Sequence, residues 1–218
     1  KKHDFVEIEY TGRIKDDNTI FDTTELEVAK ENGIYNKNAA YEPAVICVGE
    51  SSILKNLEEQ MIGKETGKEY TFEVVSENAF GRKSAKLIQL IPTSKFRQQN
   101  IQPVPGLQLN IDGVFGIVKT VSGGRCLVDF NHPLSGKDLI YDVSIKRVVE
   151  DSKEKLNSLL KIHLNIKDAE IELKEDTAII KLKNKITGQT QEEFKKLVEM
   201  AIPAIKNVNF AVPQEANK

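Results

Sequence analysis

Side chains suited to nucleophilic or metal chemistry are few in this sequence, and they stand far apart. The three histidines, His3, His132 and His163, fall in different segments, so we expect no metal site built from them. Residues 63–68 imitate a phosphate-binding loop, but their glycines are one residue too close and Glu69 follows where Ser or Thr is needed. Motifs of metalloproteases, serine hydrolases, dinucleotide-binding proteins and EF-hands are absent. The sequence therefore predicts no metal and no cofactor.

Aromatic residues with one acidic residue among them remain as candidates for a site. Asp22 directly follows Phe21, and Tyr10 ends an alternating stretch in front of them. Taken singly, such aromatic residues more often belong to a core, and an acid in this place is more often part of a turn. Whether these residues form a site or only a core and a turn therefore depends on the strands and helices that position them.

Alternating apolar and polar residues predict the strands of a first domain. Val6, Ile8 and Tyr10 would share one face of the first strand. We expect strands at residues 3–10, 44–48, 69–74 and 139–145. The polar segment 23–41 predicts a surface loop with one helical turn.

One short helix is predicted between the second and third of these strands. Ser51 or Ser52 would supply its N-cap, and Gly63 would end it. The apolar side would consist of Ile53, Leu54, Leu57 and Met61, with Lys55, Glu58 and Glu59 facing water. An antiparallel sheet wrapped on this helix is the simplest architecture.

Changes in composition along the chain predict three domains. The first spans residues 1–83 and 132–151, and it is interrupted by a small β-rich unit at 84–131 whose strands are separated by glycines. Residues 152–218 form the third, with the order α-β-β-α-β. Its elements are expected at 152–163, 169–174, 178–183, from a capping box of Thr190 with Glu193 onward, and at 208–212, with Pro203 kinking or shortening the second helix. The predicted fold class is α+β.

Bulk properties limit the classes of function. The chain has 218 residues, of which 39% are hydrophobic and 29% charged, with a net charge of -2, so we expect an ordinary globular protein that binds no nucleic acid. Apolar runs are too short to cross a membrane, and the first residues do not resemble a secretion signal. Cys47 and Cys126 are interpreted as small buried hydrophobic residues. A cytoplasmic location is expected.

Several short motifs occur in a set order, at residues 6–12, 21–22, 48–58, 77–81 and 139–143. Together they resemble the opening strand, the paired pocket residues, the glycine turn with pocket helix, the corner and the last strand of the FKBP-type peptidyl-prolyl cis-trans isomerases. The resemblance covers residues 1–83 and 132–151. Residues 131–136, at the exit of the insert, further resemble the SlyD subfamily, and the C-terminal domain resembles long archaeal members.

The resemblance implies an apolar pocket for a proline ring, with Asp22 as the polar group beside the twisting amide. The pocket would be lined by Tyr10, Phe21, Ile53, Leu54, Leu57, Phe80 and Tyr141. Phe21, Leu57 and Tyr141 would hold the ring, and the backbone N–H of Leu54 would anchor a substrate carbonyl. Many family members have Trp where Leu57 stands and Tyr where Phe80 stands, so details of substrate binding are expected to differ.

The insert carries more large apolar residues than so small a unit can bury. They are Ile88, Leu90, Ile91, Phe96, Leu107 and Val114. Roughly half are expected in its own core, and the others would form an exposed groove that binds unfolded polypeptide by strand addition or side-chain capture.

Two functions from different classes follow. The first is an isomerase with chaperone activity that accelerates proline-limited folding, with unfolded or proline-containing polypeptides as partners. The alternative is a holdase or assembly adaptor with little isomerase activity. An RNA-binding function is disfavoured by the charge balance. Homodimerisation through the C-terminal domain is left open.

Overall fold

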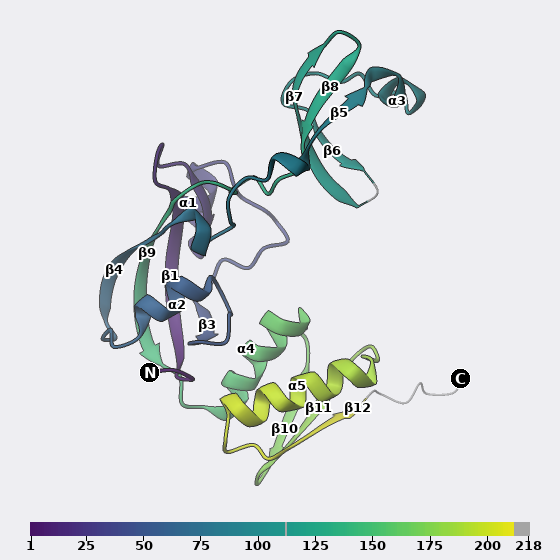
Figure 1. Ribbon diagram of the computed structural model, residues 1–218. Coiled ribbons are helices and arrows are strands. Elements are labelled where there is room, and N and C mark those ends of the chain that lie inside the picture. The colour runs from purple at the N-terminus through teal and green to yellow at the C-terminus, as the bar shows by residue number, and fades with distance from the viewer. Residues whose placement is uncertain (112, 212–218) are drawn as a thin grey trace. The chain divides into compact units, whose positions relative to one another are not determined.

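The computed structural model describes residues 1–111 and 113–211 (Figure 1). The chain forms two compact units. Residues Lys1–Val74 and Leu139–Lys218 make the first, and Val75–Asp138 make the second. The sequence predicted an insert at residues 84–131 and a separate domain at 152–218. In the structure the C-terminal segment instead belongs to the same compact unit as the first sheet. The predicted α+β class with antiparallel sheets is confirmed.

The first unit is built on a five-stranded sheet. Its strands are β1 (Phe5–Ile14), β2 (Ile20–Thr23), β3 (Ala44–Cys47), β4 (Lys68–Val74) and β9 (Leu139–Val148). They lie in the order β2-β1-β9-β4, with β3 also paired to β1, and every pairing is antiparallel. The first half of β1 pairs with β3 and its second half with β2, so β2 and β3 share one edge of β1.

Two short helices accompany this sheet. α1 (Leu26–Glu31) occupies the start of the predicted 23–41 loop and buries Ala29, and residues 32–43 then run without regular structure to β3. α2 (Lys55–Met61) buries Leu57 and Met61, as the apolar spacing predicted. Gly63 follows this helix with a positive φ of 81°, a conformation that favours glycine.

The predicted start of α2 was wrong in two respects. The N-cap residue is Leu54, which has no side-chain capping bond, rather than Ser51 or Ser52. Glu58 was expected to face water but is fully buried, and its carboxylate accepts hydrogen bonds from the backbone of the preceding loop. The backbone N–H groups of the loop before the helix thus find their acceptor in a side chain of the first helical turn.

The second unit contains a four-stranded antiparallel sheet in the order β5-β8-β7-β6. Its strands are β5 (Ile88–Pro92), β6 (Gln108–Ile111), β7 (Val114–Ser122) and β8 (Arg125–Asp129). The helix α3 (Thr93–Gln98) lies between β5 and β6, and the 3-10 turns η1 (Ser76–Asn78) and η2 (Ala85–Leu87) precede β5. The buried residues of its small core are Phe96, Leu109, Val118, Cys126 and Val128.

The C-terminal segment has the predicted α-β-β-α-β order. It consists of α4 (Ser152–Leu164), β10 (Glu170–Lys174), β11 (Thr177–Lys181), α5 (Gly188–Ala201) and β12 (Asn207–Ala211). β11 pairs antiparallel with β10 and parallel with β12. Residue 212, the predicted end of the last strand, lies outside the described residues.

The predicted capping box at Thr190 was wrong. α5 begins at Gly188, and Thr187 is the N-cap, because its Oγ1 accepts a hydrogen bond of 3.2 Å from the Thr190 backbone N–H. Thr187 also satisfies the capping preference, but a Thr with Glu three residues later gave the stronger sequence signal. The helix ends at Ala201, before Pro203, as expected.

One hydrophobic core joins the C-terminal segment to the first sheet. Phe5 of β1, Cys47 of β3 and Val149 after β9 belong to the same buried cluster as Leu156 and Leu160 of α4. The sheet of β10, β11 and β12 and the inner face of α5 complete this cluster. The C-terminal segment is therefore packed onto the first sheet within one unit.

Candidate active site

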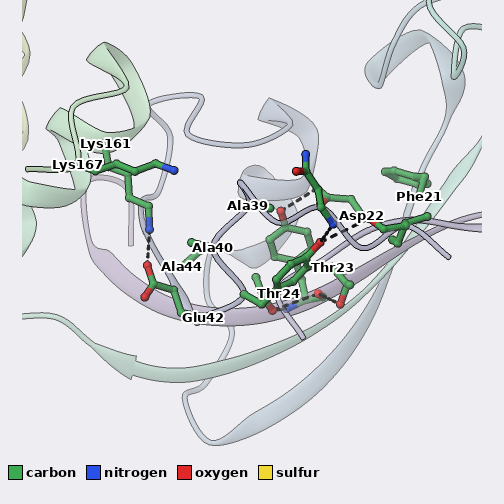
Figure 2. Close-up of a pocket in the computed structure, with 14 residues that line it drawn as sticks. Phe21, Asp22, Thr23, Thr24, Ala39, Ala40, Glu42, Ala44, Lys161 and Lys167 are labelled. Carbon is green, nitrogen blue, oxygen red and sulfur yellow. Dashed lines mark hydrogen bonds and ion pairs between the residues drawn. The ribbon is translucent and has the colours of Figure 1, made fainter. Parts of the chain in front are cut away.

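A hollow of about 380 Å³ opens between β1, β2, loop 32–43 and the C-terminal end of α4 (Figure 2). Its lining includes Tyr10, Phe21, Asp22, Thr23, Thr24, Ala39, Ala40, Tyr41, Glu42, Lys161 and Lys167. Of the residues predicted for a proline pocket, Tyr10, Phe21 and Asp22 line it. Each comes from a strand of the antiparallel sheet, which gives the site a rigid support.

Tyr10 and Asp22 form the polar centre of this hollow. The Tyr10 hydroxyl donates a hydrogen bond of 2.8 Å to Asp22 Oδ2. Burial raises the pKa of Tyr10 well above its usual range, and the negative charge of Asp22 raises it further. The phenol therefore keeps its proton at neutral pH and orients one oxygen of an exposed carboxylate.

Three aromatic rings meet beside this pair. Phe21 and Tyr141 pack edge to face, with ring centroids 5.8 Å apart, and Tyr10 and Tyr141 are 6.0 Å apart. Gly12 lies beneath them, and a Cβ added there would come within 2.8 Å of Phe21 Cζ and 3.0 Å of Tyr141 Cε1. Glycine thus leaves the space that these rings occupy. Burial also raises the pKa of Tyr141.

Two threonines that sequence reasoning missed hold Asp22 in place. The backbone N–H of Tyr10 donates to Thr24 Oγ1 at 2.9 Å, and the N–H of Thr24 donates to the Tyr10 carbonyl at 3.0 Å. The hydroxyls of Thr11 and Thr23 are bonded to each other at 2.8 Å. Both Thr23 and Thr24 are buried. No sequence signal marks them, because their partners lie on another strand.

The remaining predicted pocket residues do not line this hollow. Leu57 is only 1% exposed and belongs to the core under α2, while Ile53 and Leu54 are half-buried just before that helix. Phe80 lies in the second unit, where its ring stacks on His132 with centroids 4.3 Å apart. The structure brings together Tyr10, Phe21, Asp22 and Tyr141, and the shared role of all the predicted residues stays a prediction.

Glu58 fixes the loop that leads to Leu54. Its Oε2 accepts hydrogen bonds from the N–H groups of Gly49 at 2.7 Å and Ser51 at 3.1 Å, and its Oε1 accepts from Ile53 at 2.9 Å. The carboxylate is completely buried. Charge-assisted bonds of this kind are about twice as strong as neutral ones. The loop is therefore held rigidly in front of α2.

Loop 32–43 is closed on itself by Tyr41 and tied to α4 by Glu42. The backbone N–H of Asn36 donates to the Tyr41 hydroxyl at 2.8 Å, and the rings of Tyr35 and Tyr41 stack with centroids 5.7 Å apart. Lys161 Nζ donates to Glu42 Oε1 at 2.6 Å (Figure 2). One wall of the hollow is thus joined to the C-terminal segment.

The apolar residues predicted to bind polypeptide divide into two groups in the second unit. Phe96 is buried, and Ile91 and Leu107 pack partly buried against the same core. Ile88, Leu90 and Val114 are 36%, 61% and 52% exposed. Ile88 and Leu90 lie on β5, which is an edge strand of its sheet.

No group of three or more His, Cys, Asp or Glu residues suited to a metal ion occurs in residues 1–111 and 113–211. Within the same described ranges, none of the helices has the length and apolar character needed to span a bilayer.

Comparison with known proteins places the chain among prolyl isomerases. A protein of Methanocaldococcus jannaschii named short-type peptidyl-prolyl cis-trans isomerase is 34% identical over 148 residues, which cover 68% of this chain and 93% of that protein. An FKBP-type 16 kDa peptidyl-prolyl cis-trans isomerase of Escherichia coli is 28% identical over 131 residues, 58% of this chain and 83% of that protein. SlyD of Helicobacter pylori, also named an FKBP-type isomerase, is 24% identical over 137 residues, 61% of this chain and 74% of that protein.

A family model described as FKBP26, IF domain, matches residues 89–134. These residues fall within the second unit, and the M. jannaschii match extends over nearly the whole of that relative. The resemblance carried by the ordered sequence motifs is thereby confirmed, and the chain belongs to the family of FKBP-type peptidyl-prolyl cis-trans isomerases.

Proposed function

We propose that this isomerase rotates X-Pro bonds at the hollow around Asp22 and retains unfolded polypeptide through residues 84–131. The observation that carries the first part is the Tyr10–Asp22 hydrogen bond beside the rings of Phe21 and Tyr141. A single oriented carboxylate next to an aromatic surface suits a reaction that needs no covalent step.

An apolar surface can accelerate prolyl rotation by itself. The planar amide is resonance-stabilised, and rotation meets a barrier of about 18–20 kcal/mol. In the twisted state the carbonyl is less polar, so losing water costs it less than it costs the planar ground state. A dry aromatic surface thus binds the twisted form preferentially, which is the condition for catalysis. Each tenfold gain in rate requires about 1.4 kcal/mol.

The proposed roles follow from position. Phe21 and Tyr141 would contact the proline ring, and Asp22, oriented by Tyr10, would interact with the rotating amide. The parts assigned to Ile53, Leu54, Leu57 and Phe80 rest on the order of the sequence motifs.

Support for the chaperone part comes from exposed apolar residues. Leu90 and Val114 are 61% and 52% exposed, although the unit has a core of its own. They lie on β5 and β7 of one four-stranded sheet, where exposed apolar side chains can contact another polypeptide. Holding an unfolded chain near Asp22 would raise the effective concentration of its prolines.

Two assays separate these parts. One is isomerisation of a tetrapeptide, followed by exchange NMR without a protease, and the other is refolding of a protein limited by a proline step. Asp22→Ala and Phe21→Ala should slow both reactions. The double variant Leu90→Ser, Val114→Ser should slow refolding and leave the tetrapeptide unaffected. Leu173→Ser, which alters an apolar residue of the C-terminal segment with 39% exposure, serves as the matched control.

Equal losses by the double variant in both assays would contradict the division of labour. If Asp22→Ala were silent while aggregation of a client was still suppressed, the chain would act as a holdase or assembly adaptor instead. The exposed residues Ile88, Leu90 and Val114 are the observation that keeps this second function open.

A further inference from the structure

The wall of the hollow opposite Asp22 comes from the C-terminal segment. Lys161 lies near the end of α4, and Lys167 follows in the connection to β10. Figure 2 shows both side chains on the far side of the hollow from Phe21 and Asp22, with Ala39 and Ala40 between them. The substrate hollow therefore has a cationic end that the isomerase domain itself does not supply.

Only one of these two cations is neutralised. Lys161 forms the ion pair with Glu42 at 2.6 Å. Lys167 is exposed, and no acidic group of residues 1–111 and 113–211 forms an ion pair with it. Its chain neighbour Asp168 pairs instead with Lys183, at 2.9 Å. An ammonium without an ion pair thus lines a hollow whose acidic residues are Asp22 and Glu42, and Glu42 is already paired with Lys161.

This cation is held by packed structure. Leu156, Leu159 and Leu160 of α4 share a buried core with Phe5 and Cys47 of the first sheet. The Lys161–Glu42 pair adds a second attachment at the rim of the hollow. The backbone that carries Lys167 therefore follows directly from a helix that is anchored to the first sheet.

We propose that Lys167 forms a subsite for an acidic side chain of the substrate, so that the enzyme prefers X-Pro segments with Asp or Glu a few residues from the proline. The proposal rests on the isomerase function proposed for the Asp22 hollow, since it assigns the far end of that same hollow. Asp22 stays beside the proline, and the anionic side chain lies against Lys167.

The expected preference is modest and depends on salt. An ion pair with an exposed lysine changes a binding constant by about two- to fivefold. Because the pair is solvent-accessible, the preference should fall as ionic strength rises and the Debye length shrinks below about 10 Å.

The test uses a series of peptides with one common X-Pro core. Glu, Gln or Lys is placed in turn at successive positions on either side of the proline, and both kcat/KM and peptide affinity are measured at low and high salt. At one or more positions the wild-type chain should favour Glu over Gln and Gln over Lys. Lys167→Glu should invert this order. Lys185→Glu makes the same charge change at an exposed lysine outside the hollow and should leave the order as in the wild type.

The outcomes separate the two proposals. An unchanged order in Lys167→Glu, with the Gln peptides still isomerised, would overturn the subsite and leave the isomerase function standing. If Lys185→Glu also inverted the order of peptide preference, the net charge of the chain would explain the effect, and the subsite would be overturned. If no peptide were isomerised, the isomerase function would fail, and the affinity series would still decide whether Lys167 binds acidic chains.

Discussion

Asp22 Oδ2 lies 2.8 Å from the hydroxyl oxygen of Tyr10 and accepts a hydrogen bond from it. The bond joins β1 to β2 across their shared edge, next to the ring of Tyr141. It constrains the only acidic side chain of the β1–β2 wall of the hollow, among the described residues. The first prediction tests what this constraint contributes.

Removing the carboxylate should impair catalysis far more than stability. For Asp22→Ala we expect kcat/KM to fall about ten- to a hundredfold, the value of a hydrogen bond to a charged group. Tyr10→Phe removes the hydrogen-bond donor but retains the Asp22 carboxylate, and it should lower kcat/KM about threefold to tenfold. Asp16→Ala, at an exposed turn, is the control and should be silent. Tetrapeptide isomerisation and urea unfolding measure the two effects, and equal activities for Asp22→Ala and wild type would remove Asp22 from the mechanism.

Adding a methyl group at Gly12 should displace the aromatic rings. The new Cβ would come within 2.8 Å of Phe21 Cζ, so Gly12→Ala should lower the free energy of unfolding by about 1–3 kcal/mol and reduce activity as well. Gly188→Ala is the matched control, because no atom lies within 4 Å of the added Cβ there. If Gly12→Ala left both quantities unchanged, the rings would not be packed as described.

Glu58→Gln should destabilise the loop before α2. The two carboxylate oxygens accept three backbone N–H groups, and an amide can accept on one side only. At least one buried donor then loses its partner, which costs about 1–3 kcal/mol in the free energy of unfolding. Glu59→Gln changes the next residue, which is exposed and pairs only loosely with Lys55 at 3.9 Å, and should have little effect. Similar unfolding curves for the two variants would contradict this account.

Alkaline pH should lower the free energy of unfolding before it ionises Tyr10 and Tyr141 in the folded chain. Burial raises the pKa of the Cys47 thiol from 9.0 to about 12, and burial raises those of Tyr10 and Tyr141 from 10.0. Above pH 9 the unfolded chain therefore releases protons that the folded chain retains. Stability is full below that pH and is lost progressively as the pH rises toward the folded-state values. Urea unfolding across this range measures the slope, and Cys47→Ala should make it shallower. A slope of opposite sign would contradict the assigned burial.

Sequence reasoning was strongest where the signal is local. The alternation in residues 3–10 located the first part of β1, which continues to Ile14. The motif at residues 21–22 selected Phe21 and Asp22, and the structure brings Asp22 next to Tyr10. The buried hydroxyls of Thr23 and Thr24 could not be predicted, because their partners lie on a different strand. Helical spacing alone placed Glu58 on the wet side of α2, whereas unsatisfied backbone donors in the preceding loop draw it inward.

The lysine side of the hollow could not be predicted from the sequence for the same reason. Lys161 and Lys167 lie in ordinary charged sequence, and only the shared core of α4 with Phe5 and Cys47 brings them to the site. Composition correctly predicted the element order of this segment but not what it packs against.

The central place of β9 has a consequence for synthesis of the chain. β9 separates β1 from β4, so neither strand has its main partner until residues 139–148 have left the ribosome. All pairings of the β5–β8 sheet, in contrast, lie within residues 88–129 and are complete earlier. During translation the β5–β8 sheet can therefore assemble first, while β1 and β4 gain their main partner only when β9, which is made after that sheet, has emerged.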